Sequence, residues 1–143
     1  MATFTRNNDF AKHLANKIFD LDTDVIRWVL SNTAPTVSTT FLLSDVTQIA
    51  TGGGYTQMTD GAGGILATFS ALTQSTAAAN VATTGNVFTA TGAVGPFRYI
   101  ILVDDTPTSP LNPVLGWLDH GTAITMANTD TYTIPSGSLF TIN

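Results

Sequence analysis

The 143-residue chain contains no cysteine and no glutamate, and it carries little charge of either sign. The absence of Cys excludes disulfide bonds and thiolate metal sites, and with them a small secreted protein held together by disulfides. All ten acidic residues are Asp and five residues are basic, so charged residues make up 10% of the chain, against about 25% in an average protein. So weakly charged a surface does little to keep copies apart, which favours a subunit of an assembly over a monomer.

Long apolar runs and basic clusters are missing as well. No segment approaches the roughly 18–20 consecutive apolar residues that a membrane-spanning helix needs, so we expect no membrane partner. The N-terminus lacks the apolar centre of a signal peptide, and we therefore expect synthesis in the cytoplasm. The net charge of −5 argues against nucleic acid as a partner, because nucleic-acid binding requires basic patches.

The residues that are abundant favour β-strands. Thr recurs throughout, together with Val, Ile, Phe and Tyr, and these residue types suit a pleated sheet. Turn signals follow one another every ~8–12 residues, as in sandwiches and barrels. We therefore predict a mainly β fold, in which residues 1–143 form a single-domain antiparallel β-sandwich of the jelly-roll or immunoglobulin-like type.

One helix is expected over residues 8–21, packed on the sandwich. Phe10, Leu14 and Ile18 recur every fourth residue, which places them on one face of a helix. A shorter helix is expected to begin at Ser44 and to continue through Ile49.

Two neighbouring strands, over residues 97–104 and 114–119, are expected at the centre of the sandwich. In the first, alternation predicts one face with Phe97, Tyr99, Ile101 and Val103 and the other with Arg98, Ile100 and Leu102. Further strands are predicted over residues 25–30, 65–73, 86–91, 123–126, 131–134 and 138–142. In the strand over 25–30, Ile26, Trp28 and Leu30 are expected to share a face.

Several patterns suggest catalytic or ligand-binding residues, and each also has a purely structural explanation. Asp20, Asp22 and Asp24 are spaced like the start of a Ca²⁺ loop, but Val25 and Ser31 stand where that motif requires Gly and Glu. Solvated acids at the end of a helix are the better interpretation.

The pairs Asp104-Asp105 and Asp119-His120 close the two central strands. A carboxylate beside an imidazole can serve acid–base catalysis, yet Asp is also common in turns for its bonds to the backbone. Adjacent residues on a strand moreover point to opposite faces.

Other candidates are weaker still. The glycines of 52–54 and 61–64 are followed by no Lys-Ser/Thr and form no phosphate loop, and His13 lacks enough companions for a metal site. Arg98 is expected to pair with an Asp rather than to bind an anion. Five aromatic residues suit either a carbohydrate platform or the core: Trp28, Tyr55, Tyr99, Trp117 and Tyr132. We assign no catalytic, cofactor-binding or metal-binding residue and expect no cofactor.

Six stretches of the sequence are distinctive in their order and spacing. They are Asn8–Ala15, Val25–Pro35, Ser44–Tyr55, Gly95–Thr106, Leu115–Gly121 and Asn128–Ile134. Together they span almost the whole chain and resemble a family of small structural (virion) proteins of tailed bacteriophages.

The resemblance implies a virion component without catalytic residues. Within that class we expect a head decoration (cement) protein, which is made in the host bacterial cytoplasm, sits on the capsid surface and stabilises contacts between capsomers. The implied partners are the major capsid protein and copies of the chain itself, as a homotrimer. The alternatives are a tail or neck component, and a glycan-binding module on the virion surface that uses exposed aromatic residues.

Overall fold

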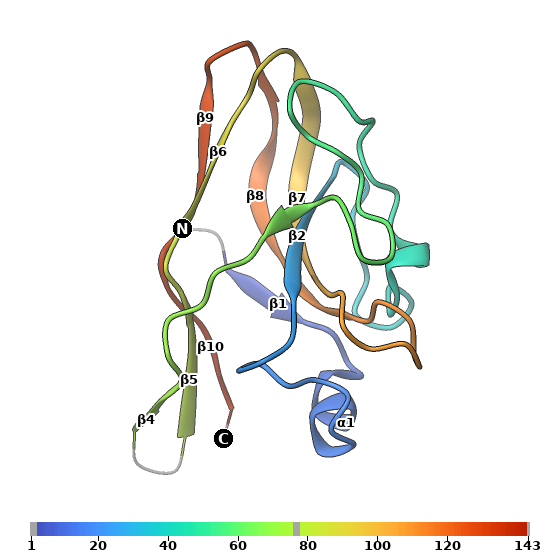
Figure 1. Ribbon diagram of the computed structural model, residues 1–143, viewed down its shortest axis with the longest axis vertical. Coiled ribbons are helices and arrows are strands. Elements are labelled where there is room, and N and C mark those ends of the chain that lie inside the picture. Colours follow the sequence, from blue (N-terminus) through green and yellow to red (C-terminus); the bar gives the residue numbers. More distant parts are fainter. Residues whose placement is uncertain (1–2, 76–77, 143) are drawn as a thin grey trace.

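The computed structural model describes residues 3–75 and 78–142 and confirms the expected fold class, a mainly β chain with antiparallel sheets and one short N-terminal α-helix (Figure 1). The strands are β1 (Phe4–Arg6), β2 (Ile26–Ser31), β3 (Ile65–Leu66), β4 (Thr73–Ser75), β5 (Ala78–Thr83), β6 (Asn86–Thr89), β7 (Val94–Asp104), β8 (Val114–Met126), β9 (Thr131–Ile134) and β10 (Gly137–Ile142). The helical elements are α1 (Phe10–Ala15) and the 3-10 turn η1 (Leu43–Asp45).

Three sheets make up the sandwich. The largest has the order β1-β8-β7-β2-β3, and the long strands β7 and β8 lie at its centre, as expected for the two apolar runs. The other two, β10-β5-β4 and β6-β9, lie together on one side of it (Figure 1). Every pairing between the strands is antiparallel.

The main core fills the space between these layers. The large sheet contributes the expected face of β2, with Ile26, Trp28 and Leu30 all buried. The facing sheets contribute buried residues from β5, β6 and β9, namely Val81, Phe88 and Ile134. This burial removes apolar surface from water, which is the main favourable term in folding.

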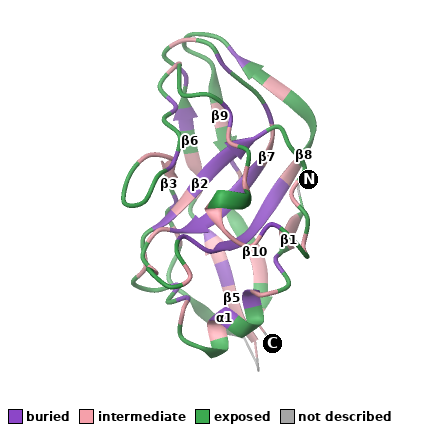
Figure 2. Ribbon diagram, turned by 90° about the vertical axis from the view of Figure 1, so that its right-hand side faces the viewer, coloured by how far each residue is buried: buried purple, intermediate pink, exposed green. Residues whose placement is uncertain are grey.

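A second, smaller core covers the opposite face of the large sheet. Val29 of β2 and Ile101 and Val103 of β7 pack there under loop residues that include Met58. Figure 2 views the molecule from this side and shows η1 and its neighbouring loops in front of the buried β2, β7 and β8. The central strands are therefore buried on both faces, which explains their nearly continuous apolar sequence.

For the apolar residues and Tyr99, the expected faces of β7 are correct except at Phe97. Ile101 and Val103 belong to the second core, with Tyr99 packed against it, but Phe97 lies in the main core with Ile100 and Leu102. The reason is a shift in pairing register, because Phe97 pairs with Ile124 whereas Tyr99 pairs with Asp119. Simple alternation cannot anticipate such an irregularity.

The helix is much shorter than the expected span of residues 8–21. It ends because Lys17 adopts a φ of 56°, and the Ile18 and Lys17 N–H groups donate to the carbonyls of His13 and Leu14 at 2.9 and 3.1 Å. This pair of bonds is a Schellman motif, which usually has Gly where this chain has Lys17. The chain beyond it is not helical, and Phe19 packs against Phe10 with ring centroids 5.6 Å apart.

Other boundaries also differ from expectation. The strand expected over 65–73 is interrupted after β3, where the Asn86 side chain donates to the Leu66 carbonyl at 2.9 Å and accepts from the Thr68 N–H at 3.3 Å. The strands expected over 114–119 and 123–126 are joined in β8. The helix expected through Ile49 is only the turn η1, because the backbone becomes extended at Val46 (φ −93°, ψ 122°) and the Ile49 N–H donates to the Leu30 carbonyl of β2 at 3.0 Å.

Candidate functional site

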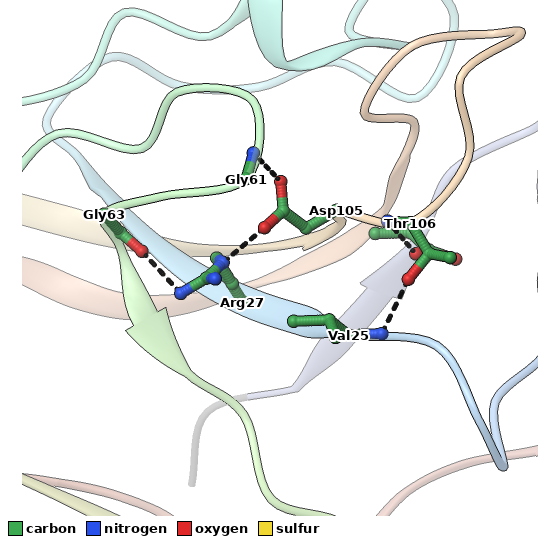
Figure 3. A network of polar contacts seen from close by, with 7 residues as sticks. Val25, Arg27, Gly61, Gly63, Asp105 and Thr106 are labelled. Carbon is green, nitrogen blue, oxygen red and sulfur yellow. Dashed lines mark hydrogen bonds and ion pairs between the residues drawn. The ribbon is translucent and has the colours of Figure 1, made fainter.

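The ends of β2 and β7 hold a polar network in which the candidate residue Asp105 is central (Figure 3). Asp105 Oδ2 accepts from Arg27 Nε at 2.6 Å, and its Oδ1 accepts from the Gly61 N–H at 2.9 Å. Arg27 also donates to the Gly63 carbonyl at 3.0 Å. Both oxygens of the carboxylate are thus engaged, and the network fastens the glycine-rich loop to the large sheet.

Asp104, the neighbouring candidate, is completely buried. Its Oδ1 accepts from the Thr106 N–H at 3.0 Å, while its Oδ2 has no hydrogen-bond partner in the described part of the chain. Burial raises the pKa of Asp104 to about 8, and the nearby carboxyl groups of Asp24 and Asp105 add to the rise. The group is therefore protonated over much of the physiological range, as a desolvated carboxyl should be.

This network can support structure but is poorly placed for catalysis. A general acid or base must come within hydrogen-bond reach of a substrate, and a completely buried Asp104 offers no such access. The Thr106 hydroxyl accepts from the Val25 N–H at 2.7 Å, which joins the exit of β7 to the entry of β2. Apart from the local bond between the Thr106 N–H and Asp104, these contacts connect segments that are far apart in the chain.

The side chains of the adjacent residues Asp119 and His120 have different partners in the structure. Asp119 accepts two hydrogen bonds from Arg98, at 2.7 and 2.8 Å, and these bonds lower the pKa of its carboxyl. This is the ion pair expected for Arg98. His120 instead contacts Tyr132, with 3.4 Å between its Nδ1 and the tyrosine hydroxyl. The carboxylate and the imidazole therefore do not form the hydrogen-bonded pair that acid–base catalysis would use.

The acidic residues near α1 bind backbone rather than one another. Asp24 Oδ2 accepts from the Asp20 N–H at 2.7 Å, and Asp20 Oδ1 accepts from the Asp22 N–H at 3.2 Å. Within residues 3–75 and 78–142, no group of three or more His, Cys, Asp or Glu side chains is arranged to hold a metal ion. His13 is buried against Phe19, and burial lowers the pKa of its imidazole.

Three of the five candidate platform aromatics are buried, namely Trp28, Tyr55 and Trp117. The Tyr55 hydroxyl accepts from the Leu30 N–H at 3.1 Å and donates to Gln48 Oε1 at 3.2 Å, and burial raises its pKa to about 12. These rings support the core, whereas Tyr99 and Tyr132 are half-buried.

The glycine-rich segment is explained by close packing. A Cβ on Gly63 would lie 2.1 Å from the Gln57 carbonyl oxygen, and one on Gly53 would lie 2.5 Å from that of Ala93. Both positions have a positive φ, which glycine adopts without strain. Their role is to let the loop approach other backbone segments.

One feature that the sequence did not indicate is a groove of about 580 Å³ beside η1. Three segments far apart in the chain line it: residues 42–48, Met58 with Asp60, and Leu111 with Asn112. No local pattern reveals such a surface, because it exists only once the loops have folded onto the large sheet.

Comparisons with protein-family models, with curated proteins and with solved structures found no significant match for this chain. Among the described residues, no helix has the length and apolar character to cross a membrane.

Proposed function

We propose that this chain is a non-enzymatic structural protein of a tailed-bacteriophage virion, and within that class a head decoration (cement) protein. In this role it binds the outside of the capsid as a homotrimer and braces neighbouring capsomers through contacts with the major capsid protein. The six distinctive stretches of the sequence, which resemble phage virion proteins, support the class.

The observation that carries the proposal is the uncharged second layer of the sandwich. The strands β4, β5, β6, β9 and β10 contain no Asp, Glu, Lys or Arg, and each of the two sheets ends in strands with only one neighbour. Monomeric β proteins usually protect such edges with charged residues or proline, because unpaired N–H and C=O groups can pair with another chain. Uncharged edges therefore favour a subunit that pairs with its neighbours.

The exposed apolar side chains agree with this role. Val87 on β6 is 64% exposed and Leu66 on β3 is 53% exposed. Isolated exposed apolar residues are common on any surface. These two therefore support a subunit contact only in combination with the uncharged edges.

Cryo-electron microscopy of the phage particle that contains this chain tests the proposal directly. We expect density of its shape on the outer face of the capsid, around symmetry axes between capsomers. Density in the tail or neck would replace the decoration role with the alternative structural role. A particle that lacks the chain altogether would refute both.

A paired substitution tests the edge contact. Val87→Lys adds a charge to β6, whereas Ala11→Lys adds the same charge to an exposed position of α1. We expect Val87→Lys to reduce co-sedimentation with undecorated capsids and Ala11→Lys to leave it unchanged, with equal urea midpoints. Equal capsid binding by the two variants would contradict a role for the uncharged layer.

A further inference from the structure

The groove beside η1 has walls that are held in place before any partner arrives. The Leu43 N–H donates to the Asn112 carbonyl at 2.9 Å, which ties η1 to the loop between β7 and β8. The Gln48 amide donates to the Met58 carbonyl at 2.8 Å and accepts from the Met58 N–H at 2.7 Å. A partner that enters such a groove loses little binding energy to reorganisation of the walls.

About half of the residues that line the groove are apolar. Met58 is buried, Leu43 and Val46 are half-buried, and Leu111 is 47% exposed at the rim. An aliphatic chain can pack against these side chains, and the unbranched Met58 adapts readily to such a partner.

The charge at the groove is entirely negative. The Asp60 carboxylate lies in its lining, is exposed, and makes no hydrogen bond or ion pair with the described residues. Asp45 lies in the adjacent turn η1, where its carboxylate accepts from backbone N–H groups, and none of the described Lys or Arg residues lines the groove. Asn112 is 3% exposed, and its Oδ1 has no hydrogen-bond partner in the described structure. The groove thus combines apolar lining residues with one exposed carboxylate, that of Asp60, which has no counter-charge among the described residues.

We propose that this groove binds a Lys or Arg side chain of a partner protein, presented from a segment with aliphatic neighbours. The methylene stem lies along Leu43, Met58 and Leu111, and the charged group pairs with Asp60. Long basic side chains favour this combination of an apolar path and a charged end. The chemistry of the groove does not depend on the virion role.

The probe for this site is the n-hexylammonium ion, which carries the charge of a Lys side chain on a slightly longer aliphatic chain. Titrated into ¹⁵N-labelled protein at pH 7 and followed by NMR, it should shift the backbone amides of Leu43, Met58 and Leu111. Hexanoate has a matching chain with the opposite charge, and we expect it to bind at least fivefold more weakly.

Two pairs of variants separate the contribution of the Asp60 charge to binding from that of the apolar lining. Asp60→Asn should weaken hexylammonium binding about two- to fivefold, the range expected for an exposed ion pair, while Asp22→Asn, the same change outside the groove, should have no effect. Leu111→Ser should weaken it as well, whereas Val87→Ser on β6 should not. Equal binding of hexanoate, unchanged binding by Asp60→Asn, or shifts confined to other surfaces would overturn the proposal.

Discussion

The buried carboxyl of Asp104 makes the stability of this protein depend on pH in an unusual direction. Its pKa is raised to about 8 in the folded chain, whereas an exposed Asp in the unfolded chain has a pKa of about 3.9. Between these values the folded state holds a proton that the unfolded state has lost. The free energy of unfolding therefore falls as the pH rises through this window, and the contribution levels off above about pH 8.

The magnitude follows from the size of the shift. Each pH unit within the window is worth about 1.4 kcal/mol, so Asp104 should lower the free energy of unfolding by about 4 kcal/mol between pH 4.5 and pH 8. Asp104→Asn removes this dependence because the amide stays neutral. Its carbonyl can still accept from the Thr106 N–H, and its NH₂ replaces the Oδ2 atom, which has no partner among the residues that the structure describes.

Urea unfolding followed by tryptophan fluorescence at several pH values measures this effect. We expect the wild type to lose stability relative to Asp104→Asn as the pH rises, so that the variant is the more stable protein at pH 8. A direct NMR titration of the Asp104 carboxyl should show a midpoint well above that of an exposed Asp. Parallel stability curves for the two proteins, or a carboxyl that titrates near pH 4, would refute the reasoning.

Three further predictions concern packing and ion pairs, and each is measured as a change in the free energy of urea unfolding. Trp117→Ala should cost about 3–5 kcal/mol, because the indole is only 6% exposed in the second core; a loss below about 1 kcal/mol would contradict its role there. Gly61→Ala should lower the free energy of unfolding by about 1–2 kcal/mol, because Gly61 has a positive φ. Gly63→Ala should lower it by about 1–3 kcal/mol more than Gly61→Ala does, because the added Cβ would also meet the Gln57 carbonyl. Equal losses for the two variants would show that the loop relaxes around the added Cβ. Arg98→Ala should leave the free energy of unfolding nearly unchanged, since the ion pair with Asp119 is solvent-exposed, and a clear loss of stability would mean that the pair is more than a surface contact.

The alternation of side chains was informative where the strands are regular. Ile26, Trp28 and Leu30 could be placed on one face of β2 from sequence alone, because a regular strand alternates strictly. Phe97 was placed on the wrong face because β8 has four residues, 120–123, between the partners of Phe97 and Tyr99, where β7 has only Arg98. The length of a partner strand is not visible in the sequence of the strand itself.

The end of α1 shows a second reason why the sequence alone did not predict the structure. The apolar spacing of Phe10, Leu14 and Ile18 continues past Ala15, so the pattern alone predicts a longer helix. The helix ends because Lys17 adopts a left-handed conformation and the chain turns to bury Phe19 in the core. Tertiary packing decided this against the local preference, since a non-glycine residue pays about 1–2 kcal/mol for that conformation.

For the candidate site residues, too, some properties were predictable from sequence and others depend on tertiary contacts. The acidic residues at the ends of the central strands were identifiable from sequence as turn formers, and Asp105 and Asp119 do bind backbone and basic groups there. Asp104 is completely buried, and its Oδ2 atom has no partner among the described residues, because segments from other parts of the chain, including Asp24 and Pro113, lie beside it. The groove beside η1 depends likewise on three distant segments.

The mainly β class, the turns and the two central strands could be predicted from the sequence, because they follow from local preferences and from alternation along one strand. The face that Phe97 occupies, the desolvation of Asp104 and the position of the groove beside η1 became clear only from the folded chain. These features arise from contacts between residues far apart in the chain, and no local pattern contains that information.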